Sequence, residues 1–145
     1  MPGIVVGFDG SENAEYALDW AMRHAAAEHV PVTVLTVNEV AVSPYTGDPA
    51  FMPADAAMLD HAQRAAQEAA AKAASQFSEA DRPEVTVTAL SGFAGQELVA
   101  ASRGADLLVI GSRGQRGFPA LRVSEIATKV AHYADCPVVI VPPAR

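Results

Sequence analysis

The chain has 145 residues, half of them hydrophobic, which is enough for one domain, residues 1–145, with a sizeable core. Its 17 acidic and 10 basic residues give a formal net charge of -7, which excludes a general attraction to nucleic acid or an anionic membrane surface. No charged leader precedes the first apolar run, and no run approaches the roughly 20 apolar residues of a membrane-spanning helix. These features predict a cytoplasmic protein that binds neither nucleic acid nor membrane.

Short apolar runs alternate along the chain with alanine-rich amphipathic stretches. The runs predict five strands, at residues 4–8, 32–37, 85–90, 106–110 and 138–141. The stretches predict four helices: one capped by Ser11 or Asn13, and three at residues 54–77, 96–102 and 124–133. Strands joined by helical crossovers predict an α/β fold, a five-stranded parallel sheet with helices on both faces. The proline-rich segment 41–53 is predicted to be a plain loop or a lid over a site.

The most informative motif is the glycine-rich stretch 111–118, which directly follows the fourth predicted strand. Closely spaced glycines let the backbone turn without Cβ clashes, and the N–H groups of such a loop and of the next helix can face an anion. Arg113 and Arg116 add positive charge there. The stretch therefore predicts either a phosphate-binding loop or a plain strand-to-helix connection whose glycines only permit the turn.

Asp9 ends the first predicted strand. Ligands of open parallel sheets bind outside the carboxyl ends of the strands, where the strand order reverses. If the first and fourth strands are neighbours there, Asp9 and the glycine-rich stretch share one crevice. Asp9 can then accept hydrogen bonds from a ribose hydroxyl or an adenine amine, and the backbone near Val37 can meet the edge of a base. Capping of the helix that starts after Gly10 is an alternative role for Asp9, and the two roles are compatible.

The single cysteine and the four histidines indicate no site. Cys136 cannot form an internal disulfide and is predicted to be a small buried core residue in preference to a reactive thiol. No histidine has a second metal-binding side chain at ligand spacing, so no metal site is predicted. The sequence also shows no P-loop, no set of magnesium-binding carboxylates and no Ser-His-Asp order, so no catalytic residue is assigned.

Three segments together resemble the universal stress protein family. They are residues 6–11 (VGFDGS), 106–118 (DLLVIGSRGQRGF) and 130–141 (VAHYADCPVVIV). The resemblance covers essentially the whole chain. It implies a Rossmann-like fold with strand order 3-2-1-4-5, dimerisation, and stress-linked cytoplasmic roles without a defined reaction. Many family members also bind ATP or another adenine nucleotide.

The resemblance also implies a nucleotide site. Gly7 and Asp9 fall beside the adenine and ribose, and the backbone of Val37 contacts the base. Gly111 and Gly114 fall at the phosphates. Arg113 lies between the two loop glycines and is included in the site for its charge.

The last part of the family's nucleotide motif is absent. In nucleotide-binding members, nine residues separate the second loop glycine from a further glycine and a serine or threonine, and this chain has Ser124 and Glu125 there. Ser124 adds a side chain where the backbone should approach a phosphate, and Glu125 adds a like charge. The pair would equally stabilise a helix start without a ligand. Pairing of Glu125 with Arg113, Arg116 or Arg122 would leave the loop amides free. Because the side chain of Ser124 and the charge of Glu125 both oppose a bound phosphate, we expect weak or no ATP binding.

Two functions are compatible with these motifs. The favoured one is a stress-response regulatory module that binds an adenine nucleotide weakly in a crevice between strands one and four. The alternative is a nucleotide-hydrolysing or nucleotidyl-transferring enzyme on the same scaffold. The sequence favours the module because the residue types that phosphoryl transfer requires are not found near the glycine-rich stretch.

The last predicted strand, Val138–Val141, indicates a partner. In strand order 3-2-1-4-5 it lies at an edge of the sheet, where its backbone groups lack a second strand and its side chains are all apolar. Prolines flank this strand and leave its middle open. A homodimer paired through it is predicted. The alternative is that residues 41–53 or the tail Ala144-Arg145 cover this edge within one chain.

Overall fold

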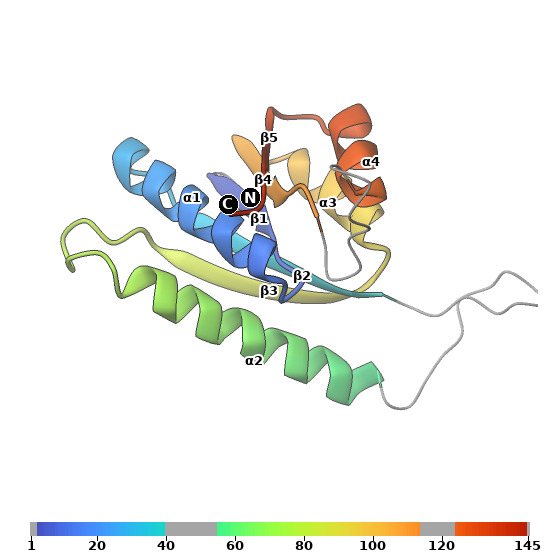
Figure 1. Cartoon of the computed structure of the whole chain (residues 1–145), viewed down its shortest axis with the longest axis horizontal. Helices are drawn as coiled ribbons and strands as arrows, with labels where there is room; N and C mark the ends of the chain where they lie inside the picture. Colours follow the sequence, from blue (N-terminus) through green and yellow to red (C-terminus); the bar gives the residue numbers. More distant parts are fainter. Residues whose placement is uncertain (1–2, 40–54, 114–123, 145) are drawn as a thin grey trace, which may run out of the picture.

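The computed structural model of the chain describes residues 3–39, 55–113 and 124–144, in which strands and helices alternate (Figure 1). The strands are β1 Ile4–Gly7, β2 Val32–Glu39, β3 Val85–Gly92, β4 Leu107–Gly111 and β5 Val138–Val141. The helices are α1 Glu12–Glu28, α2 Asp55–Ala74, α3 Ala94–Ser102 and α4 Glu125–Tyr133. Segment 41–53 and residues Gly114, Arg116 and Arg122, which entered the predictions, lie outside the described residues.

The five strands form one parallel sheet in the order β3-β2-β1-β4-β5, which confirms the predicted topology. β1 is central, and Val6 at its middle is in register with Val34 of β2 and Val109 of β4. The order reverses between β1 and β4, because the chain moves outward through β2 and β3 on one side and through β4 and β5 on the other. The carboxyl ends of β1 and β4 therefore frame the crevice in which such sheets bind ligands.

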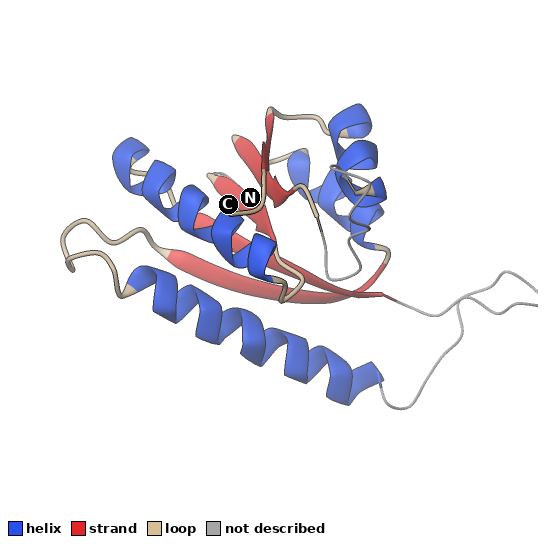
Figure 2. Ribbon diagram, in the orientation of Figure 1, coloured by secondary structure: helices blue, strands red, loops and turns tan. Residues whose placement is uncertain are grey.

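Side chains of β1 alternate between the two faces of the sheet, and each face is covered by a pair of helices (Figure 2). Ile4 and Val6 belong to the core cluster that α1 and α2 cover. Val5 belongs to the opposite cluster, which includes Leu98 of α3 and Val130 of α4. The prediction of helices on both faces is confirmed, and burial on both faces explains why the strands are almost continuously apolar.

Helix α1 begins with two interlocking local hydrogen bonds. Ser11 is its N-cap, and the Ser11 hydroxyl accepts a hydrogen bond from the Ala14 N–H at 3.1 Å. The Asp9 carboxylate accepts a hydrogen bond from the Ser11 N–H at 2.9 Å. This geometry decides between the two predicted caps in favour of Ser11 and gives Asp9 its expected local role. Asn13, the other candidate, is buried within the first turn of the helix.

Cys136 is half-buried and packs against the α3 and α4 side of the core, so it is less enclosed than the predicted buried residue. Among the described residues, there is no group of three or more histidine, cysteine, aspartate or glutamate side chains that could hold a metal ion. None of the helices in the described ranges is both long enough and apolar enough to cross a membrane.

Candidate functional site

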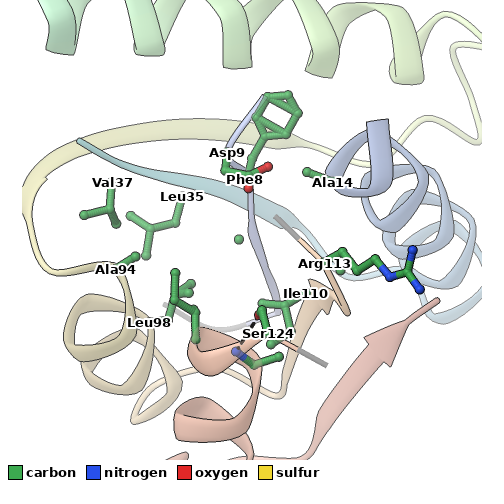
Figure 3. A pocket seen from close by; sticks show the side chains of 14 residues that line it. Phe8, Asp9, Ala14, Leu35, Val37, Ala94, Leu98, Ile110, Arg113 and Ser124 are labelled. Carbon is green, nitrogen blue, oxygen red and sulfur yellow. Dashed lines mark hydrogen bonds between the residues drawn. The ribbon is translucent and has the colours of Figure 1, made fainter. Parts of the chain in front are cut away.

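A pocket lies at the carboxyl ends of β1 and β4 (Figure 3). Its volume is about 100 Å³. Sequence reasoning predicted several of its lining residues, and these are Gly7, Asp9, Val37, Gly111, Arg113 and Ser124. The structure thus brings the end of the first strand and the start of the glycine-rich stretch together, as expected for neighbouring parallel strands.

Two predicted site residues are not among the described lining. Gly114 lies outside the described part of the chain. Glu125 is exposed in the first turn of α4 and does not line the pocket, although its neighbours Ser124 and Ile126 do. Glu125 is therefore next in sequence to two lining residues but is not itself among the described residues of the pocket wall.

One wall of the pocket is apolar. Leu35 and Val37 of β2 lie on the same side of the pocket as Ala94 and Leu98 of α3, as Figure 3 shows. A flat ring such as a nucleobase is bound well by such a surface, because both of its faces are apolar. An apolar cavity of about 150 Å³ accepts benzene. The smaller volume here suits part of one flat ring, so the rest of a nucleotide would extend beyond the enclosed region.

Gly7 forms part of the floor of the pocket for a packing reason. A Cβ at this position would lie 3.0 Å from Cγ2 of Ile110 and 3.1 Å from Cδ2 of Leu98. Both distances are too short for comfortable carbon–carbon contacts, which are optimal at about 3.5 to 4.0 Å. Glycine therefore lets β1 pass close to Ile110 and Leu98 at the base of the pocket.

Asp9 and Arg113 supply opposite charges to the lining. Asp9 is exposed, and its carboxylate turns back to the Ser11 N–H. The Arg113 guanidinium points toward α1 in Figure 3, away from the apolar wall. Its Nε atom is buried and has no hydrogen-bond partner in the described part of the chain. The backbone of Arg113 is fixed more firmly, because its N–H donates to Oδ1 of Asn13 at 2.8 Å.

The first turn of α4 satisfies several of its own polar groups. The Ser124 hydroxyl accepts a hydrogen bond from the Ala127 N–H at 3.1 Å, and the Ser124 N–H donates to the Ser112 carbonyl at 2.8 Å. Glu125 places its negative charge in the same turn. This is the capping arrangement that was predicted as the alternative to phosphate binding. An incoming phosphate would find the Ala127 N–H already bonded and a negative charge in the same turn.

Sequence reasoning did not predict most of the apolar lining. These residues are Phe8, Ala14, Leu35, Ala94, Leu98, Ile110, Ile126 and Ala127. Hydrophobic periodicity assigns such residues to an inward face but does not distinguish the wall of a pocket from the core. The available signal was position, because Leu35 and Ile110 lie near the carboxyl ends of their strands, and Ala94 and Ile126 lie in the first turns of α3 and α4.

Comparisons with known proteins identify the family and the fold. The universal stress protein family profile matches residues 2–142. A universal stress protein of Mycobacterium tuberculosis is 37% identical over 145 residues, an alignment that covers 99% of this chain and 49% of that relative. The chain thus spans about half the length of the curated relatives it matches.

Solved structures show the same fold. The universal stress protein UspA from Lactobacillus plantarum aligns with a TM-score of 0.79 and 20% identity over 97% of both chains. A universal stress protein in complex with cAMP aligns with a TM-score of 0.67 and 23% identity, covering 99% of this chain and 98% of that one.

Proposed function

The chain belongs to the universal stress protein family, and on that premise we propose that it is a regulatory module of the stress response that holds an adenine nucleotide weakly. The nucleotide lies in the pocket between β1 and β4. In this proposal the module is cytoplasmic, forms one domain over residues 1–145, and has no catalytic residues of its own. It acts as a homodimer paired through β5.

The observation that carries the proposal is the composition of the pocket. Its apolar wall suits a base, and Asp9 stands at its open side, where a carboxylate can accept hydrogen bonds from ribose hydroxyls. The structural relative in complex with cAMP supports an adenine nucleotide as the ligand class. Gly111 and Arg113 also line the pocket, and in Figure 3 Arg113 lies on the other side from Leu35 and Val37, where we place the phosphates.

The charged groups of the pocket support a binding role over phosphoryl transfer. Enzymes that transfer phosphoryl groups hold magnesium with several carboxylates and stabilise the transferred group with lysine or arginine. Among the described lining residues, Asp9 is the carboxylate and Arg113 the cation, and the guanidinium is directed toward α1. We expect weak triphosphate binding because the Ser124 hydroxyl already takes the Ala127 N–H and Glu125 places a negative charge in the same turn.

The test is to denature the purified protein, separate any released nucleotide by chromatography, and titrate the nucleotide-free protein with cAMP, AMP and ATP in a calorimeter. We expect binding of at least one adenine nucleotide, with ATP bound weakly or not at all. Asp9→Ala should weaken binding about tenfold, because hydrogen bonds to a charged group are lost. Asp19→Ala on α1, which is outside the pocket lining, is the matched control. Absence of binding for all three nucleotides would overturn the proposed ligand, and nucleotide turnover would overturn the proposal of a purely binding role.

A further inference from the structure

The Asn13 carboxamide joins two segments that are far apart in the sequence. Asn13 is 7% exposed. Its Nδ2 donates a hydrogen bond to the Val141 carbonyl at 3.2 Å, and its Oδ1 accepts one from the Arg113 N–H at 2.8 Å. Val141 is the last residue of β5, and Arg113 follows β4. One buried side chain from α1 thus holds the end of the edge strand and the start of the glycine-rich stretch together.

The surrounding backbone is built around this carboxamide. A Cβ on Gly111 would lie 2.9 Å from both Cγ and Oδ1 of Asn13, so only glycine leaves room for the side chain. The Val141 carbonyl also accepts a hydrogen bond from the Ser112 N–H at 2.9 Å. The Arg113 N–H needs an acceptor, and the Val141 carbonyl has room for a second hydrogen bond; a carboxamide supplies an acceptor and a donor from one side chain.

The two segments that Asn13 joins have different proposed roles. Gly111 and Arg113 line the pocket that is proposed to hold the nucleotide. β5 is an edge strand, hydrogen-bonded to β4 on one side, and is proposed to pair with a second copy on the other. A shift of the backbone at Arg113 can reach the end of β5 through this carboxamide, because Asn13 is 7% exposed and is hydrogen-bonded to both segments.

We propose that Asn13 is a positioning residue that couples the nucleotide pocket to the edge strand β5, so that nucleotide binding and dimerisation strengthen each other. This coupling rests on the proposed function, since it needs both a nucleotide and a dimer. The effect is reciprocal by thermodynamic necessity: if the nucleotide tightens the dimer, the dimer tightens nucleotide binding by the same factor. A purely structural Asn13 would contribute to stability and leave the nucleotide dependence of dimerisation unchanged.

Three substitutions disturb the two hydrogen bonds of the Asn13 carboxamide. Asn13→Ala removes both hydrogen bonds, and Gly111→Ala keeps Asn13 but places a Cβ against its carboxamide. Asn13→Asp separates the two bonds, because a carboxylate still accepts from Arg113 but no longer donates to Val141 when ionised. Asn38→Ala on β2 is the matched control, since Asn38 is half-buried and is not among the described lining residues.

The measurement is the dimer dissociation constant by analytical ultracentrifugation, with and without saturating cAMP, the compound held by a structural relative. In the unmodified chain we expect cAMP to tighten the dimer by about fivefold or more, a typical coupling between sites. This dependence should vanish in Asn13→Ala, Asn13→Asp and Gly111→Ala, and remain in Asn38→Ala. Hydrogen exchange at the amides of Ser112 and Arg113 should accelerate in Asn13→Ala without any ligand.

Three outcomes separate the coupling from the function on which it rests. Nucleotide-dependent dimerisation that persists in Asn13→Ala overturns the coupling and leaves the proposed function intact. An unmodified chain that binds no nucleotide overturns the proposed function, and unchanged exchange at Ser112 and Arg113 in Asn13→Ala then overturns the positioning role as well. If Asn13→Ala does not fold, Asn13→Asp and Gly111→Ala decide the question by the same ultracentrifugation, and retained coupling in a folded variant overturns the proposal.

Discussion

The Cα of Gly7 stands at the floor of the pocket, with side chains of Leu98 and Ile110 packed against the space that a Cβ would take. Gly7→Ala should therefore lower the free energy of unfolding by about 1 to 3 kcal/mol through overpacking. It should also narrow the pocket and weaken nucleotide binding. Urea denaturation and calorimetric titration measure the two effects.

Gly95→Ala is the matched control for Gly7→Ala. The nearest atom to a Cβ at Gly95 is Cδ of Lys129, at 2.9 Å, and this atom belongs to a flexible side chain that can move aside. Alanine also favours a helix over glycine, so the control should keep or raise the stability of the protein. Equal losses of stability in the two variants would show that packing against Leu98 and Ile110 is not the reason for the destabilisation by Gly7→Ala.

The Cys136 thiol should react slowly with alkylating reagents. Partial burial raises its pKa above the ordinary value, the charges of Asp106 and Asp135 add to this rise, and a backbone hydrogen bond at Leu108 opposes it. Because the pKa is raised in the folded state, the resulting stabilisation is present below the pKa of the unfolded chain and is lost as pH rises through the folded pKa. Iodoacetamide labelling at pH 8 should be slower than for an unfolded peptide containing Cys136. Faster labelling than in that peptide would contradict the raised pKa.

Asp9, Gly111 and Ser124 line the pocket and were predictable from the sequence, because each carries a local signal: a charge after a strand, a glycine in a turn, a cap before a helix. The local signal of Asn13 was misleading, because an asparagine near the start of a helix is predicted to be its N-cap. Its true partners, Arg113 and Val141, are separated from it by 100 and 128 residues, and no local pattern encodes such contacts.

At the scale of elements, the expectation of weak ATP binding depends on the first turn of α4. Ser124 caps the turn with its hydroxyl, and Glu125 places a charge there. Ser124→Gly combined with Glu125→Ser should raise ATP affinity about two- to fivefold, the range expected for one charge near a helix N-terminus. Calorimetric titration of both proteins with ATP measures the change.

Glu12→Ser provides the control for the α4 variant. Glu12 follows the Ser11 cap of α1 just as Glu125 follows the Ser124 cap of α4, but Glu12 is not among the described lining residues. It should leave ATP affinity unchanged. An unmodified chain that binds ATP tightly, with the same affinity in the double substitution, would show that the carboxylate of Glu125 does not oppose phosphate.

The order and type of the elements were predictable because strand and helix periodicities differ strongly, whereas their ends were not. β2 and β3 each continue two residues past the predicted ends, to Glu39 and Gly92, because the two strands pair along their whole length. The Ala94 N–H donates to the Glu39 carboxylate at 3.2 Å, so α3 begins two residues before Gln96, the predicted start. Both extensions depend on contacts between segments that are distant in sequence.

At the scale of the whole molecule, the two edges of the sheet differ in chemistry. β3 forms one edge and exposes the polar side chain of Thr86. β5 forms the other, and its residues Val138–Val141 are all aliphatic, with the first three only half-buried in the single chain. Unpaired backbone groups and partly exposed apolar side chains favour pairing with another strand, and a two-fold axis satisfies both copies equally. We therefore place the proposed dimer interface at β5.

Ile140→Lys tests this interface, because a lysine in the middle of β5 would bring two like charges close to the two-fold axis. We expect the unmodified chain to be a dimer at micromolar concentration by light scattering and the Ile140→Lys variant to be a monomer that retains its circular dichroism spectrum. Thr86→Lys on β3 places the same charge on the opposite edge and should remain dimeric. A dimer that survives Ile140→Lys but dissociates with Thr86→Lys would move the interface to β3. A monomeric unmodified chain would rule out this interface and favour the alternative, an intrachain cover of the edge by residues 41–53 or 144–145.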